Sequence, residues 1–206
     1  DNVKGDVSFE HVKFGYNEDR VIIHDFSAQA KAGQKIAIVG PTGAGKTTLI
    51  TALLPALKKR NLSTAVIKHD GHEFEADIPG TDTWKAGEAG ACGTLVFSGT
   101  KYMMVKYHPA ESTEELISLF PEADIILLEG FKHSEYPKIE VIRKANSLCS
   151  VCDPRFLQGI VTDISREELK YDAGEEVEEI PFFELDETEP LAEWICQLWK
   201  KKQSSL

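Results

Sequence analysis

The sequence predicts a three-layer α/β domain with a mostly parallel central sheet and an antiparallel β-hairpin added in front of it. Three observations predict this class. Short apolar segments alternate along the chain with segments of helical periodicity. Residues 125–128 are apolar on both faces, as expected of a central strand in a parallel sheet. Residues 7–14 instead alternate apolar and polar side chains, which is typical of a hairpin with one face in water.

The expected elements follow one another in a regular order along the 206 residues, which we expect to form a single domain. The hairpin is expected at 7–14 and 21–28, with a turn between them. The first core strand, 35–39, runs through a glycine-rich segment into a helix that ends near Lys59. Further strands are expected at 64–68, 94–98, 103–107, 125–128, 138–143 and 159–161, and further helices at 81–89, from 112 to 120, and at 191–201.

The composition excludes two classes of protein. Hydrophobic residues make up 42% of the chain, which supplies a core and excludes global disorder. The net charge is −11, and most of it comes from the segment 167–189, which holds eleven acidic residues and one lysine and is expected to be a solvated connection. Nucleic acids and anionic membranes attract clustered basic residues. We therefore expect no nucleic-acid partner, and any phosphate binding must be local.

The expected location is the cytoplasm. No apolar run approaches the ~20 residues that span a bilayer, and residues 1–4 do not begin a signal peptide, so we expect no membrane binding by the chain itself. Four cysteines do not form a disulfide framework in a chain of this size, and we expect them to be reduced. Cys92 and Cys196 are expected to be small core residues.

The segment 40–47 matches the phosphate-loop pattern G-x-x-x-x-G-K-[ST] between a predicted strand and a predicted helix. Glycines let the backbone turn its N–H groups toward an anion at the helix start. Lys46 is expected to meet the β- and γ-phosphates, and the Thr47 hydroxyl to bind Mg²⁺. The alternative is a glycine-rich turn that binds nothing. The expected nucleotide contacts are Gly40, Pro41, Thr42, Gly43, Ala44, Gly45, Lys46, Thr47 and Thr48.

A carboxylate is required near the metal, and Glu129 follows the apolar strand 125–128. If this strand lies beside the first core strand, Glu129 comes next to the loop and holds or polarises a water, while Gly130 lets the backbone approach the γ-phosphate. Asp70, after the strand 64–68, competes for the same metal and catalytic role. The alternative for Glu129 is an ordinary acid at the end of a strand.

The segments 5–16 and 33–49 resemble the start of an ABC transporter nucleotide-binding domain. In that family an aromatic residue at the position of Tyr16 stacks on adenine, so the resemblance implies that Tyr16 contacts the base; an ordinary hairpin tyrosine is the alternative. The family's signature Leu-Ser-Gly-Gly-Gln, its Asp-Glu pair and its switch histidine do not occur in this sequence. Their absence argues against transport coupling.

From about residue 52 the sequence resembles the molybdopterin-guanine dinucleotide biosynthesis protein B family. The similar segments are AVIKHDGHEF at 65–74, DIPGTDTW at 77–84, EAGA at 88–91, LEGFK at 128–132 and YPKIE at 136–140. The resemblance implies GTP binding and an accessory role in guanylation of the molybdenum cofactor, with a nucleotidyltransferase partner. It also implies that Thr162 and Asp163 lie near a guanine base, although a plain strand-end cap explains them equally.

The resemblance changes family within the predicted helix, at about 48–55. We interpret the chain as a deliberate chimera, and a natural protein with an unusual N-terminal hairpin is the alternative. In a chimera, core residues such as Ile36 and Leu49 come from one parent, and Val66 and Leu128 from the other. Overpacking costs about 1–3 kcal/mol per mismatched site, so stability is expected to suffer before the fold does.

Three further patterns leave alternatives open. Cys149 and Cys152 form one C-x-x-C pair, which is half of a zinc site, a redox pair or two free thiols. Trp194 and its apolar neighbours at helical spacing indicate a helix docked on the sheet, or else a homodimer contact. His69 and His72 are expected to be polar loop residues rather than metal ligands.

The predicted function is Mg²⁺-dependent binding of ATP or GTP, with slow hydrolysis or none. Hydrolysis is expected to be slow because no arginine or water-positioning glutamine is evident near the motifs, and such groups supply ~10³–10⁵ in rate. The first alternative is a scaffold that binds only phosphate-like anions. The second is an ABC-type ATPase subunit.

Overall fold

The computed structural model describes the backbone of residues 7–17, 20–30, 34–109, 112–170 and 180–204, and side chains from residue 34 onward to residue 200 within these ranges. The chain divides into two compact units, one formed by residues 1–69 with 117–206 and the other by residues 70–116. Within the described part, no helix combines the length and the apolar character needed to cross a bilayer.

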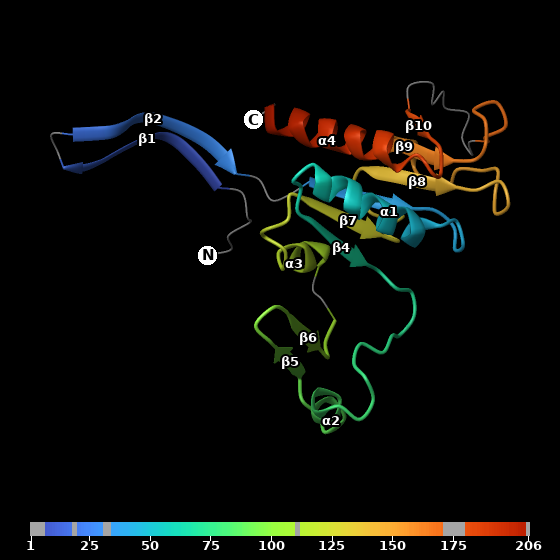
Figure 1. The fold of residues 1–206 in the computed structure, drawn as a ribbon, viewed down its shortest axis with the longest axis horizontal. Coiled ribbons are helices and arrows are strands. Elements are labelled where there is room, and N and C mark those ends of the chain that lie inside the picture. The colour runs from blue at the N-terminus through green and yellow to red at the C-terminus, as the bar shows by residue number, and fades with distance from the viewer. Residues whose placement is uncertain (1–6, 18–19, 31–33, 110–111, 171–179, 205–206) are drawn as a thin grey trace. The chain divides into compact units, whose positions relative to one another are not determined.

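The predicted N-terminal hairpin is present. Strands β1 (Val7–Asn17) and β2 (Arg20–Ala30) form a separate two-stranded antiparallel sheet (Figure 1). The two strands pair from Val7 with Ala30 to Asn17 with Arg20, and the register shifts at four points between these ends. The side chain of Tyr16 lies outside the described residues, so its predicted contact with the base stays a prediction.

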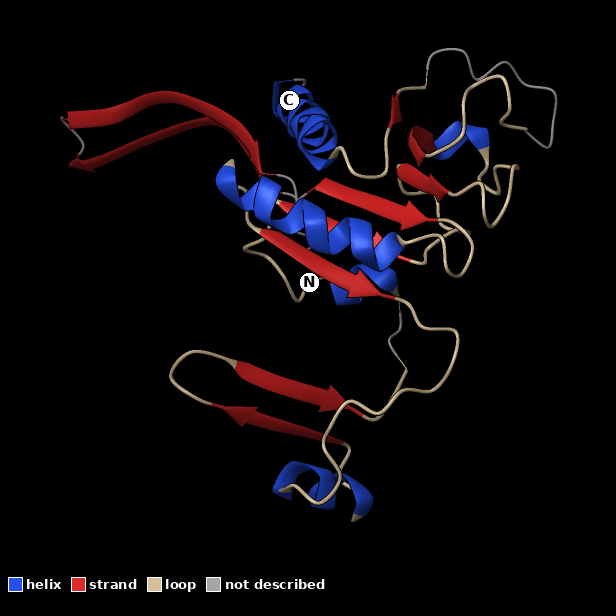
Figure 2. Cartoon of the chain, turned by 45° about the vertical axis from the view of Figure 1, so that its right-hand side comes forward, coloured by secondary structure: helices blue, strands red, loops and turns tan. Residues whose placement is uncertain are grey.

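The central sheet is parallel throughout its six strands, in the order β10-β9-β8-β3-β7-β4. The strands are β3 (Gln34–Val39), β4 (Thr64–Lys68), β7 (Ile125–Glu129), β8 (Lys138–Ile142), β9 (Leu157–Thr162) and β10 (Phe182–Phe183). Strand β3 lies between β7 and β8, so the carboxyl ends of these three strands share one edge of the sheet (Figure 2). This edge carries the loops that form the candidate site.

Both faces of the sheet are buried, which confirms the three-layer class. Helices α1 (Lys46–Lys59) and α4 (Thr188–Ser204) pack together over one face, against Ile36, Ile38 and Leu127. Side chains that alternate with these, such as Val39 and Leu128, are fully buried on the opposite face. A short 3-10 helix, η1 (Pro154–Phe156), precedes β9.

Helix α1 forms because its apolar residues recur on one side. Leu49, Leu53 and Leu57 repeat at a spacing of four and are almost completely buried. The helix continues through Pro55, which lacks the N–H needed for one helical hydrogen bond. It ends where Asn61 adopts a φ of 58°.

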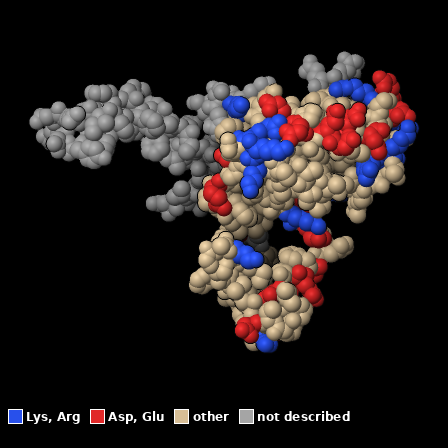
Figure 3. All heavy atoms as spheres, viewed as in Figure 1, with Lys and Arg blue, Asp and Glu red and all other residues tan. Residues whose placement is uncertain are grey.

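Ion pairs on the surface join the end of α1 to the start of α4. Arg60 Nη1 lies 2.7 Å from Glu189 Oε2, and Lys59 Nζ lies 3.2 Å from Glu189 Oε1. The hydrogen bond from Arg60 lowers the pKa of Glu189. Acidic and basic side chains lie close together over these helices (Figure 3). Such exposed pairs contribute little to stability, so the buried leucines hold α1 in place.

Strand β4 confirms the predicted strand at 64–68 but is mostly not buried. It lies at the edge of the sheet, and only Ile67 among its five residues is buried, while Val66 is 36% exposed. An edge strand has a neighbour on one side only, which leaves its side chains less covered. Among the core residues assigned to the two proposed parents, Ile36 and Leu49 therefore contribute more to the stability of the core than Val66 does.

The unit 70–116 contains helix α2 (Asp82–Glu88) and an antiparallel ribbon of β5 (Gly93–Phe97) and β6 (Tyr102–Lys106). These elements confirm the predicted ones within one or two residues. The Thr81 hydroxyl caps α2 by accepting a hydrogen bond from the N–H of Trp84 at 3.3 Å. Cys92 is exposed in this unit, so the expectation that it is a core residue is wrong.

Helix α3 (Thr113–Ile117) confirms the predicted start but not the predicted length. The Ser112 hydroxyl accepts a hydrogen bond from the N–H of Glu115 at 3.2 Å, which is one of the two hydrogen bonds of a capping box. The helix ends at Ile117, well before Pro121. In the acidic segment, residues 171–179 lie outside the described residues, and the short strand β10 that follows them was not expected from the sequence.

Candidate functional site

The loop between β3 and α1 has the backbone shape that its glycines predict. Gly40, Gly43 and Gly45 have φ values of 138°, 82° and 94°, in the region that side chains rarely adopt. At Gly40 a Cβ atom would lie 2.4 Å from the carbonyl oxygen of Val141 on the neighbouring strand β8. Only glycine fits this close approach. The loop is therefore pressed against the sheet where it leaves β3.

The N-terminus of α1 faces the loop without a side-chain cap. Gly45 occupies the capping position, no side chain accepts a hydrogen bond there, and the first turn contains no acidic residue. The first N–H groups of a helix have no partner within the helix, and the helix dipole makes this end positive. A loop of glycines ahead of such a helix end presents several donors to an anion.

Lys46 is held over the loop by the loop itself. Its Nζ donates hydrogen bonds to the carbonyl oxygens of Gly40 and Pro41, each at 2.9 Å. The N–H of Ala44 donates to the same Pro41 oxygen at 3.2 Å and closes a turn beneath the lysine. The ammonium group thus lies at the loop, where the sequence predicts the outer phosphates.

Thr47 and Glu129 meet at the edge of the sheet. The Thr47 hydroxyl donates to Glu129 Oε1 at 2.8 Å, and Glu129 is only 6% exposed. This contact exists because β3 and β7 are neighbours, with Ile38 opposite Glu129. The next residue, Gly130, has a φ of 94° and donates its N–H to the Ile38 carbonyl at 3.2 Å.

The oxygen atoms of Thr47 and Glu129 fit a hard divalent cation. Mg²⁺ prefers oxygen ligands, keeps several waters and commonly takes one or two protein ligands together with phosphate oxygens. Among the described residues there is no group of three His, Cys, Asp or Glu side chains able to hold a metal. A hydroxyl and a carboxylate beside a phosphate loop therefore suit Mg²⁺ with a nucleotide better than a metal held by protein ligands alone.

Asp70, the other predicted metal ligand, is exposed and is the first residue of the unit 70–116. The preceding residue, His69, belongs to the first unit and donates its backbone N–H to the Glu129 carbonyl at 3.0 Å. The His69 ring also lies 5.8 Å from the Phe131 ring, between centroids. The role of Asp70 at the metal stays a prediction.

Thr162 and Asp163 make the hydrogen bonds expected of a plain cap at the end of a strand. The Thr162 hydroxyl accepts a hydrogen bond from the N–H of Ile164 at 3.1 Å. Asp163 Oδ1 accepts one from the N–H of Lys144 at 2.6 Å and so links the loop after β9 to the loop after β8. These contacts leave the predicted recognition of guanine untested.

Asn146 is a residue of the site that the sequence did not reveal. It lies in the turn after β8, and its Nδ2 donates to the Thr42 carbonyl in the phosphate loop at 3.0 Å. Asn146 is separated from Thr42 by 104 positions and belongs to no recognisable motif. Only the pairing of β3 with β8 brings the two residues together.

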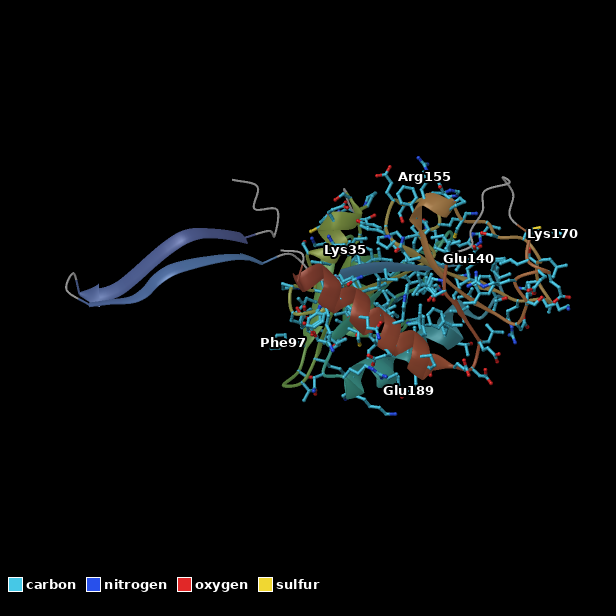
Figure 4. All side chains as sticks on the ribbon, turned by 90° about the horizontal axis from the view of Figure 1, so that it is seen from above. Lys35, Phe97, Glu140, Arg155, Lys170 and Glu189 are labelled. Carbon is cyan, nitrogen blue, oxygen red and sulfur yellow. The ribbon has the colours of Figure 1, made fainter. Side chains whose placement is uncertain are left out.

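Of the predicted cysteine pair, Cys152 lies next to a buried carboxylate on β8, whereas Cys149 is exposed. This carboxylate is Glu140, which Figure 4 labels. It accepts hydrogen bonds from Ser150 Oγ at 2.6 Å and from the N–H of Val151 at 2.7 Å. Burial, followed by the charge of Glu140, raises the pKa of the Cys152 thiol. Because a thiolate is the reactive form, this environment disfavours a redox role for Cys152.

Helix α4 docks on the sheet as its spacing predicts. Trp194 and Trp199 pack against the core formed with α1, and Cys196 is buried in the same core. The Trp194 ring lies 5.5 Å from the Phe183 ring on β10, between centroids. A homodimer contact through this helix stays a prediction.

Comparison with known proteins matches most of the chain to one family. The family model described as MobB, molybdopterin guanine dinucleotide synthesis protein B, matches residues 35–163. The molybdopterin-guanine dinucleotide biosynthesis adapter protein of Escherichia coli K12 is 37% identical over 113 residues, which are 52% of this chain and 65% of the relative. The chain thus covers slightly less than two thirds of that relative's length.

Solved structures of the same family share the fold. The crystal structure of Bacillus subtilis MobB has a TM-score of 0.59 and 27% sequence identity, and the alignment covers 81% of this chain and 97% of that one. A MobB homologue from Bacillus stearothermophilus has a TM-score of 0.55 at 16% identity, with 81% and 98% of the two chains covered, and shows the fold alone.

A shorter segment matches a different family. The β-(1→2)glucan export ATP-binding/permease protein NdvA of Agrobacterium fabrum is 56% identical over 52 residues, which are 25% of this chain and 9% of that protein. The two resemblances seen in the sequence are therefore confirmed, and the chain combines them.

Proposed function

Since this chain belongs to the MobB, molybdopterin guanine dinucleotide synthesis protein B, family, we propose that it binds a nucleoside triphosphate together with Mg²⁺ at the loop 40–47. The hydrogen bond of 2.8 Å between the Thr47 hydroxyl and Glu129 is the single observation that carries this proposal. It brings a hydroxyl and a carboxylate together beside Lys46, as binding of a metal-nucleotide requires.

The residues of the site have separate roles in this proposal. The N–H groups of the loop and of the first turn of α1 bind phosphate oxygens. Lys46 exchanges the carbonyl oxygens of Gly40 and Pro41 for phosphate oxygens. Glu129 orients a water near the γ-phosphate, and Gly130 leaves room for that phosphate. Bound Mg²⁺ would neutralise phosphate charge.

Hydrolysis is slow or absent in this proposal. Lys46 supplies the cationic contact to the loop, and among the described residues no arginine or glutamine side chain is hydrogen-bonded to residues 40–47. Phosphoryl transfer depends on positioned groups that stabilise charge and orient the attacking water, which are worth ~10³–10⁵ in rate. We therefore expect measurable nucleotide binding together with a low rate of hydrolysis.

We also propose that the chain is an engineered chimera. The 56% identity with an ABC exporter over 52 residues and the family match that reaches residue 163 support an origin from two parents. The change lies within α1, a helix that both families place after the phosphate loop. The parent role, as an adapter in molybdenum cofactor guanylation with a nucleotidyltransferase partner in the cytoplasm, is the function proposed for the remaining part.

Nucleotide titration with and without Mg²⁺ tests the proposal. Wild type is expected to bind fluorescent ATP or GTP more tightly with Mg²⁺, and Lys46→Ala to weaken binding by about 100-fold because a charge-assisted contact is lost. Lys101→Ala, an exposed lysine of the other unit, is the matched control. Unchanged affinity in Lys46→Ala would exclude the loop as the site.

Competition with inorganic phosphate distinguishes nucleotide binding from the main alternative, which is binding of phosphate-like anions alone. A scaffold that binds only phosphate-like anions would lose bound nucleotide to phosphate or sulfate at similar concentrations, and Mg²⁺ would have no effect. Binding of the base and of the metal predicts instead that a nucleoside triphosphate competes far better than phosphate does.

Competition between ATP and GTP tests the base. Tyr16→Ala should weaken ATP alone if adenine stacks on the hairpin. Asp163→Asn should weaken GTP alone if the carboxylate accepts hydrogen bonds from guanine. If neither variant weakens nucleotide binding, both residues have a structural role.

A further inference from the structure

We propose that Asn146 is a positioning residue that selects the conformation of the phosphate loop and so aims the N–H of Gly43 at the bound phosphates. This inference rests on the proposed function for its consequence in binding. Its conformational part concerns the free protein and stands by itself. The observation that carries it is the hydrogen bond of 3.0 Å from Asn146 Nδ2 to the Thr42 carbonyl.

The phosphate loop contains a β-turn, a kind of turn for which two related forms are known. Residues 41–44 form a β-turn, because the N–H of Ala44 donates to the Pro41 carbonyl at 3.2 Å. Gly43 is the third residue of this turn, and its φ of 82° is that of a type II turn. Type I and type II turns differ by a flip of the central peptide, here the one between Thr42 and Gly43.

Asn146 contacts the group that this flip would move. In a trans peptide the C=O and the N–H point in opposite directions. A hydrogen bond that holds the Thr42 carbonyl toward Asn146 therefore turns the N–H of Gly43 away from Asn146. In the type I form the carbonyl would point away from Asn146, and the hydrogen bond would be lost.

Gly43 by itself does not choose between the two forms. Glycine adopts positive and negative φ about equally, so a glycine at this position permits both turns. A Cβ atom on Gly43 would lie 3.2 Å from Asn146 Nδ2, which shows how closely the amide approaches the turn. The selecting contact must therefore come from outside the loop, and Asn146 supplies it.

The sheet fixes the position of Asn146. Its own N–H donates to the Arg143 carbonyl at 2.8 Å, as does that of Ser147 at 3.0 Å, so residues 143–147 form a closed turn at the end of β8. Asp163 accepts a hydrogen bond from the N–H of Lys144 at 2.6 Å and ties this turn to the end of β9. Contacts at the ends of β8 and β9 thus fix the position of the Asn146 side chain, which in turn binds the phosphate loop.

The free protein provides the first test. Asn146→Ala should shift the Gly43 amide resonance and lower the order parameters of the Thr42 and Gly43 backbone, because both turn forms become populated. Gln197→Ala removes an exposed amide on α4 and is the matched control. The thermal midpoint should change by no more than about 2 °C, because Asn146 is exposed. A Gly43 amide unaffected by Asn146→Ala would overturn the proposal.

Binding provides the second test. Asn146→Ala should weaken triphosphate binding about tenfold, as loss of one aimed donor implies, without altering which base is preferred. Asn146→Asp should weaken it further, because a carboxylate cannot donate to the Thr42 carbonyl and adds negative charge beside the phosphates. Weakened binding with an unchanged Gly43 amide in the free protein would show direct contact with nucleotide and overturn a positioning role.

The two proposals fail in different ways. Absence of nucleotide binding in wild type would end the proposed function, while the Gly43 resonance would still decide the conformational role of Asn146. Strong binding in wild type, lost in Lys46→Ala and retained in Asn146→Ala, would leave the proposed function in place and remove the inference about Asn146.

Discussion

Thr47 and Glu129 are joined by a hydrogen bond of 2.8 Å, although Thr47 lies in the segment that resembles ABC transporters and Glu129 in a motif typical of the MobB family. The two side chains meet because β3 and β7 pair in register, with Ile38 opposite Glu129. The pairing of β3 with β7 therefore joins a side chain from each of the two resembling segments.

The Thr47–Glu129 pair is predicted to control the effect of Mg²⁺ on binding. Thr47→Ala and Glu129→Gln should each remove most of the gain in affinity that Mg²⁺ produces, because an oxygen ligand or its charge is lost. Affinity in EDTA should change little. The measurement is nucleotide titration with and without Mg²⁺, and Thr47→Ser, which keeps the hydroxyl, is the control. Equal Mg²⁺ dependence in all variants would contradict the assignment.

Gly40 is predicted to be irreplaceable for steric reasons. In Gly40→Ala the new Cβ would approach the Val141 carbonyl to 2.4 Å at a φ of 138°, so the loop and β8 must separate. We expect a loss of about 2 kcal/mol or more in the free energy of unfolding, measured with urea. Gly71→Ala, where a Cβ meets open space and φ is not positive, should cost much less. Similar losses in both variants would argue against the clash.

The loss of stability caused by truncating Leu53 is predicted to report how well the two parental parts pack. It is fully buried in α1, close to the point where the resemblance changes, and it belongs to the core that contains Leu127. In a well-packed core, Leu53→Ala should cost about 2–5 kcal/mol in unfolding free energy. Leu54→Ala, one position along at a partly buried site, should cost less. A small loss at Leu53 would indicate a loose interface between the parts.

Glu140 is predicted to make stability depend on pH. Burial raises its pKa, although hydrogen bonds from Ser150 and Val151 partly offset this. The native state therefore binds the proton more tightly than the unfolded state does. The stability contributed by this group is complete below the ordinary glutamate pKa and is lost as pH rises through the raised value.

Glu140→Gln removes this proton linkage. Relative to the variant, wild type should gain stability as the pH falls from neutral toward about 4, as measured by urea unfolding at several pH values. Glu187→Gln, at an exposed position, controls for removal of a carboxylate. A difference between wild type and Glu140→Gln that stays constant with pH would show that Glu140 is not linked to folding.

The sequence predicted the phosphate loop and Glu129 because each depends on local chemistry. Glycines, Lys46 and Thr47 follow one another in a motif, and Glu129 follows a strand that is apolar on both faces. The hairpin and most helices were predicted for the same reason. Their periodicity and capping residues, such as Thr81 and Ser112, are visible within a few positions.

The features that the sequence did not predict depend mainly on which strands become neighbours in the sheet. Nothing near Asn146 in the sequence indicates that it reaches Thr42, since only the pairing of β3 with β8 creates that contact. The order of strands likewise leaves β4 at an edge, where Val66 is partly exposed despite its apolar surroundings in the sequence. Strand β10 has only two residues, too few for any periodic pattern to be recognised.

The place of β3 between β7 and β8 has a consequence for synthesis on the ribosome. Gln34 pairs with Ile125, so the hydrogen-bonding partners of β3 emerge about ninety residues later. The strands of the hairpin, β1 and β2, are adjacent in sequence, and among the described strands each pairs only with the other. During translation the hairpin is thus complete long before the strand that leads into the phosphate loop has anything to pair with.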